Sequence, residues 1–145
     1  MVAVLSKQSW QGVKVLELGC GVYGYVGIHL AALGADVLVT DRDDDIGARV
    51  QRCIAANEPR IAEAGGKIAY QCLDWETAEP VVDRVVVGSD LFYAEEIACI
   101  FFTYFEKIAS SISQAYFGYK SRGQELSTLF EIGLGGFTRE ELPLG

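Results

Sequence analysis

The sequence predicts an α/β fold in which a mostly parallel sheet is covered by helices on both faces. Two observations carry this prediction. Short apolar runs alternate with amphipathic segments along the chain, as they do in βαβ units. The apolar runs lack an alternating polar face, which is typical of strands that are buried on both sides.

The first βαβ unit lies between residues 13 and 41. Val13–Leu18 is predicted as a buried strand and Tyr25–Leu33 as a helix with apolar residues at helical spacing. Gly34 stands where a left-handed C-terminal cap is expected. Asp36–Thr40 is the second predicted strand.

A longer helix follows the second strand. Asp43–Asp45 supplies an N-terminal cap and carboxylates that suit the helix dipole. Gly65 and Gly66 end the helix. One face is formed by Ile46, Val50, Cys53, Ile54, Asn57 and Ile61.

The remaining elements continue the alternation. Lys67–Leu73, Val82–Gly88 and Ala115–Lys120 are predicted as the third, fourth and fifth strands. Glu95–Ile112 and Gln124–Leu134 are predicted as helices. The helix over 95–112 carries an aromatic stripe, which we expect to pack in the core: Phe101, Phe102, Tyr104 and Phe105.

Composition restricts the class of protein. A chain of 145 residues, 50% hydrophobic and 22% charged, predicts a single globular domain over 1–145. No apolar run reaches the length of a membrane span, and the first residues lack a secretory signal. The net charge of −8 disfavours a nucleic-acid surface. We expect the cytoplasm, with the nucleus as an alternative.

The cysteines predict no metal centre. Cys20, Cys53, Cys72 and Cys99 are scattered, with no pair at metal spacing. We expect reduced and mostly buried thiols. His29 lies within the first predicted helix, where a structural histidine is a better interpretation than a catalytic base.

The glycine-rich turn after the first strand does not by itself identify the cofactor. Gly19, Gly21 and Gly24 match the G-x-G-x-x-G pattern of dinucleotide sites, and Asp41 ends the next strand, where a ribose-binding acid is expected. A small NAD-binding domain is therefore one hypothesis. Glu17 favours another, because an acid at the end of the first strand can meet a cation such as the ammonium group of a methionine moiety.

Acids also follow the other strands. With Glu17 and Asp41, Asp74 and Asp90 place an acid near the carboxyl end of each of the first four strands. Ligands of open α/β sheets bind beyond these ends. Asp74 can accept a hydrogen bond from an adenine amine, and Trp75 can offer that ring an apolar face.

In this order and spacing, the segments ELGCG, VTD, LDW and SDLFY resemble class I S-adenosylmethionine-dependent methyltransferases. LDW with SDLFYAEE is similar to the seven-β-strand protein-lysine methyltransferases, and SRGQELSTLFE resembles their fifth-strand exit. The resemblance implies a three-layer Rossmann-like sheet in the order 3-2-1-4-5. It also implies S-adenosylmethionine as cofactor and a protein substrate such as a chaperone or an elongation factor.

The resemblance assigns roles by position. Glu17, Gly19 and Gly21 would bound the methionine end of the cofactor, and Asp41 would hold the ribose hydroxyl groups. Asp74 and Trp75 would flank the adenine. The acceptor mouth, and with it the catalytic role, would fall to Asp90 and Tyr93.

The chain departs from the family at three places. Tyr23 stands where the family turn lets backbone approach the ligand, as if one residue were inserted. We expect its ring to enter the cofactor pocket unless a bulge before the helix absorbs the extra residue. The N-terminal segment that carries a tryptophan and the last two strands, a C-terminal hairpin, have no clear counterpart, so we expect a domain shortened at both ends. These departures support the alternative of a catalytically impaired binding module.

Overall fold

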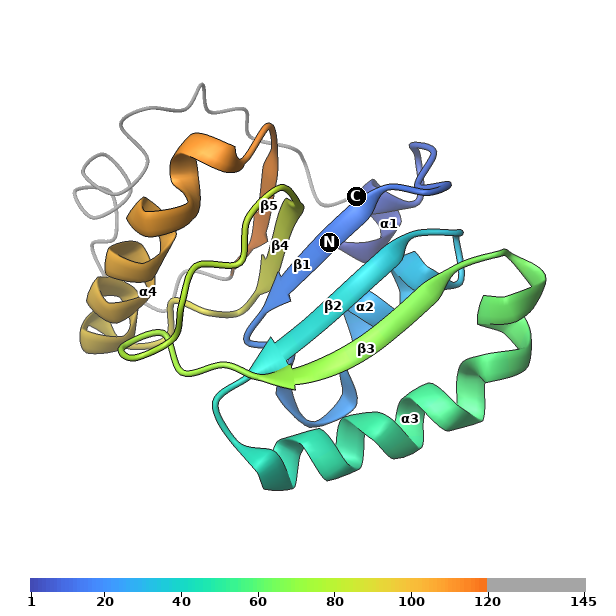
Figure 1. Ribbon diagram of the computed structural model, residues 1–145, viewed down its shortest axis with the longest axis horizontal. Coiled ribbons are helices and arrows are strands. Elements are labelled where there is room, and N and C mark those ends of the chain that lie inside the picture. Colours follow the sequence, from blue (N-terminus) through green and yellow to red (C-terminus); the bar gives the residue numbers. More distant parts are fainter. Residues whose placement is uncertain (120–145) are drawn as a thin grey trace.

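The computed structural model describes residues 1–119, which contain one five-stranded sheet in the order β3-β2-β1-β4-β5 (Figure 1). All four strand pairings are parallel. The predicted parallel sheet and its order are confirmed. The strands are β1 Lys14–Leu18, β2 Asp36–Asp41, β3 Lys67–Cys72, β4 Val85–Ser89 and β5 Ala115–Gly118.

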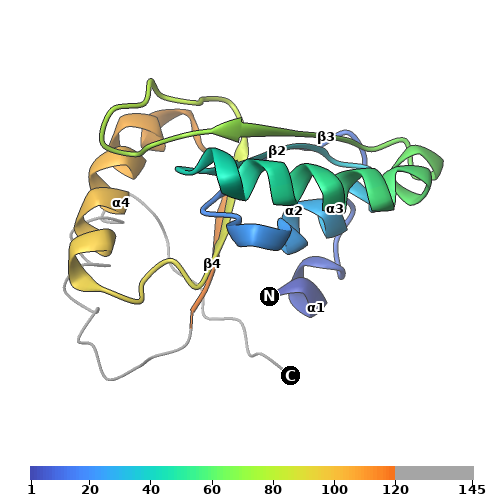
Figure 2. The ribbon, with the colours of Figure 1, turned by 90° about the horizontal axis from the view of Figure 1, so that it is seen from below.

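Helices cover both faces of this sheet. Figures 1 and 2 show α1, α2 and α3 on one face and α4 on the other, which makes three layers. The predicted helix Gln124–Leu134 and the expectation about the C-terminal hairpin lie outside the described residues. The helical elements are α1 Val2–Leu5, η1 Gly21–Tyr23, α2 Tyr25–Ala31, α3 Asp44–Glu63, α4 Glu95–Ile108 and η2 Ala109–Ser111.

The central strand β1 divides the core into two clusters. Leu16 and Leu18 pack with the side chains of α4, whereas Val15 packs with α2 and α3. Side chains along a strand alternate between the two faces of the sheet, so Glu17 shares the α2 face with Val15. β1 therefore carries an acid in the middle of a strand that is buried on both faces.

The cluster under α4 is mainly aromatic. The four residues of the predicted stripe are all buried, with exposed fractions of 0–6%. Phe101 contacts Trp75 edge-on at a centroid distance of 5.4 Å and stacks near Phe105 at 5.7 Å. Such pairs add about 0.5–1.5 kcal/mol beyond their area burial. The prediction of a core role for the stripe is confirmed.

Two helix ends follow the predicted local signals. Gly34 has φ +94° and lies after α2, where its amide donates to the carbonyl oxygen of Ala31 at 2.9 Å. Only a residue without Cβ adopts this left-handed conformation at little cost. Asp43 is the N-cap of α3 and accepts a hydrogen bond from the amide of Asp45 at 2.8 Å.

Two predicted boundaries differ from the structure by three or more residues. The fourth strand begins at Val85 instead of Val82, because Val82 is 46% exposed and Asp83 has φ +59°, outside the strand region. The helix after β4 ends at Ile108 and passes into η2, although its apolar pattern continues to Ile112. Apolar residues at these ends pack against the core without belonging to the element.

Arg84 holds the amino ends of the central strands together. Its Nη1 donates to the carbonyl oxygens of Val15 at 3.2 Å and of Asp36 at 3.1 Å, and lies 3.8 Å from the Asp36 carboxylate. One guanidinium group, directly before β4, therefore donates hydrogen bonds to carbonyl groups at the amino ends of both β1 and β2. No local pattern predicts this contact, because it joins three segments that lie far apart in the chain.

The N-terminal segment adds an element that the sequence pattern did not predict. Trp10 is 2% exposed, and its Nε1 donates to the carbonyl oxygen of Leu5 at 2.6 Å. Its ring lies edge-on to Tyr116 at 6.0 Å. Trp10 therefore ties α1 to the cluster that includes α2 and α3.

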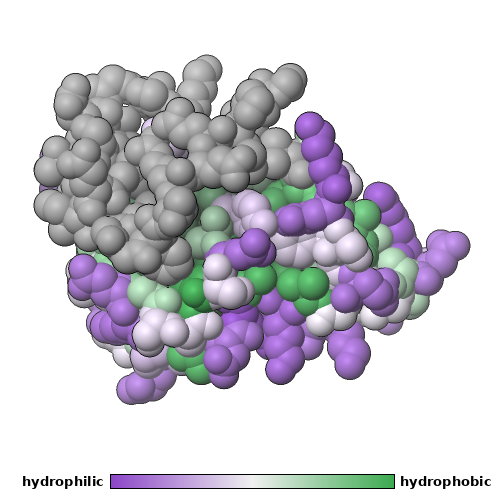
Figure 3. Space-filling view, turned by 90° about the horizontal axis from the view of Figure 1, so that it is seen from above, coloured by the Kyte–Doolittle hydropathy of each residue, from purple (hydrophilic) through white to green (hydrophobic). Residues whose placement is uncertain are grey.

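The surface is mixed in character. Figure 3 shows hydrophilic side chains along the described part of one face, with smaller hydrophobic patches between them. No helix within residues 1–119 has the length and apolar character that crossing a membrane requires. All four cysteines are free thiols, as predicted, but Cys72 and Cys99 are exposed and Cys20 and Cys53 are only partly buried, so the expectation of mostly buried thiols is wrong. Cys72 ends the edge strand β3, where few elements cover it.

We predict that Gly27→Ala destabilises the protein. A Cβ at this buried position of α2 would overlap the side chain of Val39 and lie 2.5 Å from Oε2 of Glu17. Overpacking of this kind costs about 1–3 kcal/mol, which exceeds the gain of roughly 0.5–1 kcal/mol in helix propensity. Urea unfolding measures the difference, with Ala48→Gly on the exposed face of α3 as a control for propensity alone. Equal or greater stability of Gly27→Ala would contradict the packing described here.

Candidate functional site

The glycine-rich turn after β1 is the centre of the candidate site. Gly19, Gly21 and Gly24 all have φ between +55° and +63°. A Cβ at Gly19 would lie 2.6 Å from Leu91 and 3.5 Å from the Trp75 ring. Gly19 therefore allows the chains after β3 and β4 to close against the turn.

Asp41 joins this turn to the end of β2. Its Oδ2 accepts a hydrogen bond from the amide of Gly21 at 2.9 Å, and its Oδ1 accepts one from the amide of Arg42 at 2.8 Å. The sequence predicted both residues as cofactor contacts, and the fold brings them into direct contact. Charge-assisted bonds of this kind are roughly twice as strong as neutral ones.

Asp41 and Gly21 can both still contact a ligand. A carboxylate has about four lone-pair sites, and two of those on Asp41 are used within residues 1–119. A Cβ built at Gly21 would meet nothing within 4 Å, so open space lies beside the turn. The arrangement fits a ligand whose two hydroxyl groups donate hydrogen bonds to Asp41 while the ligand lies close to the backbone of Gly21.

A buried threonine that sequence reasoning missed supports the turn. Thr40 Oγ1 donates to the carbonyl oxygen of Glu17 at 2.7 Å, and the amide of Cys20 donates to the carbonyl oxygen of Thr40 at 2.9 Å. Thr40 is fully buried. Its position could have indicated this role, because a hydroxyl group at the end of a buried apolar run, just before Asp41, needs a hydrogen-bond partner.

Asp74 and Trp75 lie in the loop after β3. Asp74 accepts a hydrogen bond from the amide of Glu76 at 3.0 Å through Oδ1, and its carbonyl oxygen accepts from Ala78 at 2.8 Å, so it shapes a turn. Trp75 packs against Phe101 and the core. Its buried Nε1 has no hydrogen-bond partner within residues 1–119, and an indole N–H of this kind usually has one. Their contact with an adenine remains a prediction.

Asp90 and Tyr93 lie directly beyond β4. Asp90 has φ +59°, a conformation that aspartate tolerates better than most residues. Its amide donates to the carbonyl oxygen of Gly118 at 2.7 Å, which fixes the chain after β4 to β5. Both residues are exposed, Tyr93 to 52%. Their predicted role at the acceptor mouth is not tested by this geometry.

Glu17 differs from the other strand-end acids. It lies inside β1, is 2% exposed, and its Oε2 accepts a hydrogen bond from the amide of Gly27 in α2 at 2.8 Å. Burial raises the pKa of Glu17 to about 8, with a smaller contribution from Asp41, while the bond from Gly27 opposes the rise. Its main contact in the structure is with α2, and the contact with an ammonium group stays a prediction.

Tyr23 does not occupy the space beside Asp41. The extra residue of the turn is accommodated in η1, and the Tyr23 side chain is 69% exposed. Together with Val22 it lines a groove against α3 that contains none of the predicted cofactor residues. The expectation that the ring enters the pocket is therefore wrong, because the bulge alternative is the one realised.

His29 has a structural contact. Its Nε2 lies 2.8 Å from the Ser6 hydroxyl group, which also donates to the carbonyl oxygen of Val2 at 2.8 Å. Partial burial lowers the pKa of His29, and Arg60 adds to this shift. Among residues 1–119, no three His, Cys, Asp or Glu side chains are arranged to hold a metal ion.

Comparison with protein families gives one match that covers most of the chain. The model of a family described as lysine methyltransferase matches residues 2–132. Among mouse proteins (Mus musculus), methyltransferase-like protein 22 is 26% identical over 125 residues, which cover 73% of this chain and 32% of the relative. EEF1A lysine methyltransferase 3 is 35% identical over 89 residues, which cover 59% of this chain and 36% of the relative.

Solved structures share the fold. A magnesium protoporphyrin IX methyltransferase from Synechocystis PCC 6803, with bound SAM, has a TM-score of 0.66 at 22% identity, covering 93% of this chain and 64% of that one. A TehB-like SAM-dependent methyltransferase from Corynebacterium glutamicum has a TM-score of 0.64 at 20% identity, covering 92% and 70%. These likenesses confirm the Rossmann-like methyltransferase fold.

We predict that Glu17→Gln removes part of the pH dependence of stability. In the wild type the folded pKa of about 8 exceeds the unfolded value near 4.5. The stability that Glu17 contributes is therefore complete below pH 4.5 and is lost as the pH rises toward 8, a loss on the order of 5 kcal/mol. Glutamine keeps an acceptor for the Gly27 amide and cannot ionise. Urea unfolding from pH 5 to 9 should show a flatter profile for the variant, and parallel profiles would contradict the buried carboxyl group.

Proposed function

The chain belongs to the lysine methyltransferase family, and we propose that it transfers a methyl group from S-adenosylmethionine to a lysine of a protein. It spans about a third of the length of the mouse relatives that it matches. The activity, the cofactor and the substrate of the whole protein are therefore proposed from the site and the family together.

The contact between Asp41 and Gly21 carries the proposal. It joins the ends of β1 and β2 at the edge where open α/β sheets bind ligands. A ribose presents two adjacent hydroxyl groups, which match the two remaining acceptor positions of Asp41. The open space beside Gly21 admits the ligand close to the backbone.

The other predicted residues surround this contact. Gly19 lies against Trp75 and Leu91, so the turn, the loop after β3 and the chain after β4 meet at one place. We propose that Asp74 and Trp75 border the adenine and that the turn borders the methionine end. The bound cofactor would supply an activated methyl group on a sulfonium sulfur.

Asp90 and Tyr93 are proposed to position the lysine. The lysine amine must be neutral when its nitrogen forms the new bond to the methyl carbon, while the sulfur keeps the electron pair of the broken bond. A carboxylate and a phenol at the mouth can orient the amine by hydrogen bonds, and solvent takes the proton. Positioning of this kind accounts for most of the expected catalysis.

The two alternatives from the sequence have less support. Tyr23 and the expected shortening of both ends motivated an impaired binding module, and the Tyr23 ring lies outside the predicted cofactor residues. The literal G-x-G-x-x-G motivated an NAD-binding domain, and the family match over residues 2–132 favours methyl transfer instead.

The class of protein substrate and the cellular location are also part of the proposal. The name of EEF1A lysine methyltransferase 3 supports a protein substrate, and a chaperone or an elongation factor is proposed on the sequence resemblance. We propose the cytoplasm as the location, consistent with four free thiols.

We predict that the purified chain transfers labelled methyl groups from S-adenosylmethionine to lysines of proteins in a cell lysate. Asp90→Ala and Tyr93→Phe should retain the affinity for S-adenosylhomocysteine and lose transfer, for Asp90→Ala by about a hundredfold. Mass spectrometry of the labelled proteins identifies the modified side chain. Label on another side chain, or full activity of both variants, would overturn the assignment, and wild type heated to unfold it is the background control.

We predict that Asp41→Ala weakens S-adenosylhomocysteine binding more than Asp74→Ala does. A ribose diol can donate two charge-assisted hydrogen bonds to Asp41, whereas an adenine amine donates one to Asp74, and the loss of such bonds costs about 1.5–3 kcal/mol. Isothermal titration calorimetry measures both affinities, and circular dichroism verifies the folding of each variant. Equal affinities of wild type and Asp41→Ala would show that the ribose does not lie at the end of β2.

A further inference from the structure

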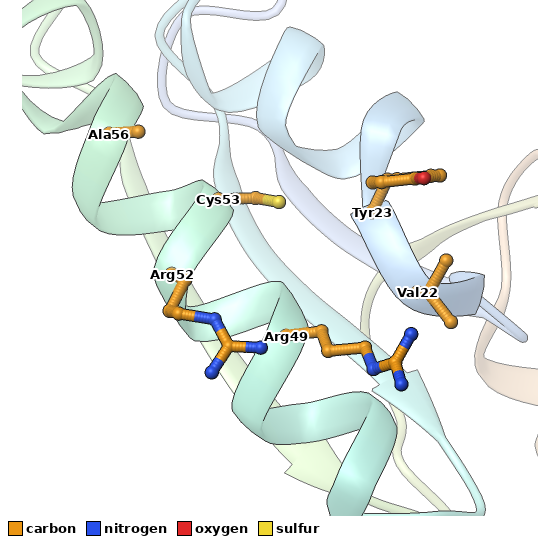
Figure 4. A pocket seen from close by; sticks show the side chains of 6 residues that line it. All are labelled: Val22, Tyr23, Arg49, Arg52, Cys53 and Ala56. Carbon is orange, nitrogen blue, oxygen red and sulfur yellow. The ribbon is translucent and has the colours of Figure 1, made fainter.

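A groove on the outer side of the glycine turn has a chemistry that the proposed reaction does not use. It lies between η1 and α3 and has a volume of about 400 Å³ (Figure 4). We call it the η1–α3 groove. Its lining residues are Val22, Tyr23, Arg49, Arg52, Cys53 and Ala56.

The groove has a regular origin on α3. Positions 49, 52, 53 and 56 follow the i, i+3, i+4, i+7 spacing, so they share one face of the helix. The neighbouring face carries Val50, which packs against Gly24 and fixes η1 on the helix. The groove therefore has rigid walls on both sides, because a regular helix and a packed turn form it.

Two arginines line this groove without an ion-pair partner among the described residues. Arg49 and Arg52 are exposed, and neither guanidinium forms a salt bridge or a side-chain hydrogen bond within residues 1–119. In Figure 4 the Arg49 side chain extends from α3 toward Val22. Asp45, one helical turn earlier, forms no salt bridge with Arg49.

An apolar wall completes the groove. The Tyr23 side chain is 69% exposed, and Cys53 points from α3 toward η1. An exposed aromatic ring beside arginines is a combination enriched where proteins bind proteins. Guanidinium groups present donors in a fork that matches carboxylates.

We propose that the η1–α3 groove binds an acidic segment of the protein that the chain methylates, with Asp or Glu side chains on Arg49 and Arg52 and the peptide against Tyr23. Charge complementarity selects this occupant. A nucleic acid would need many more cations than two, because its affinity comes from many phosphate contacts. The proposal rests on the proposed function in so far as the occupant is a substrate.

The groove adjoins the candidate cofactor site. Val22 and Tyr23 follow directly after Gly21, whose amide is bonded to Asp41. An acidic segment in the groove would thus contact the outer side of the turn whose inner side is predicted to meet the cofactor. The groove would add a docking contact remote from the lysine itself, which helps to select substrates by sequence.

Binding can be tested without methyl transfer. The probe is a short fluorescein-labelled peptide of glutamate, glycine and serine, measured by fluorescence anisotropy at low salt. The charge-reversed variant Arg49→Glu/Arg52→Glu should bind it at least about tenfold more weakly than wild type. Arg60→Glu, which reverses one charge on α3 outside the groove, should bind within about twofold, and thermal unfolding verifies that all variants fold.

Further arms distinguish the outcomes. Tyr23→Ala, which keeps both arginines, should weaken peptide binding by a few-fold. Equal binding by wild type and Arg49→Glu/Arg52→Glu, or no binding of the peptide by wild type, would overturn the proposal. So would tighter binding of oligo-dT or inorganic phosphate than of the peptide with the same arginine dependence. Because the assay contains no cofactor, its failure leaves the proposed methyl transfer intact, and loss of methyl transfer would leave a positive binding result intact.

Discussion

The hydrogen bond between the Asp41 carboxylate and the Gly21 amide is the contact on which the candidate site depends. It joins the ends of two adjacent parallel strands and fixes the turn between β1 and α2. Thr40 repeats the connection one residue earlier through its hydroxyl and carbonyl groups. Without these bonds, little would fix the conformation of the turn, because its glycines have the largest conformational freedom of any residue. The site is thus a property of the sheet as much as of the glycine motif.

The sheet is fixed at both ends of its strands. Arg84 satisfies the carbonyl groups of Val15 and Asp36 at the amino ends, and the turn closes the carboxyl ends. Between them, two core clusters pack on opposite faces of β1, one of them mainly aromatic. Glu17 is the one buried carboxyl group of the described residues, and its raised pKa reflects the cost of burying a charge there.

Local patterns predicted much of this arrangement. Gly34, the Asp43 cap and the aromatic stripe follow from signals within a few residues, and the family motifs located the turn and Asp41. The orientation of Tyr23 depends on how η1 packs against Val50 of α3, which no local pattern contains. The burial of Glu17 was hidden because its neighbours are all apolar, so that the run has no visible alternation. The start of β4 depends on pairing with β1, and Val82 lies beyond the end of that partner.

The central claim is that the turn and the end of β2 form the cofactor site. A titration of the 15N-labelled chain with S-adenosylhomocysteine, followed by amide chemical shifts, tests it most directly. We expect the largest shifts at Gly19, Gly21 and Arg42, with smaller ones near Trp75 and little change along the face of α3 that lines the η1–α3 groove. Shifts confined to that face, or no shifts at millimolar ligand, would contradict it.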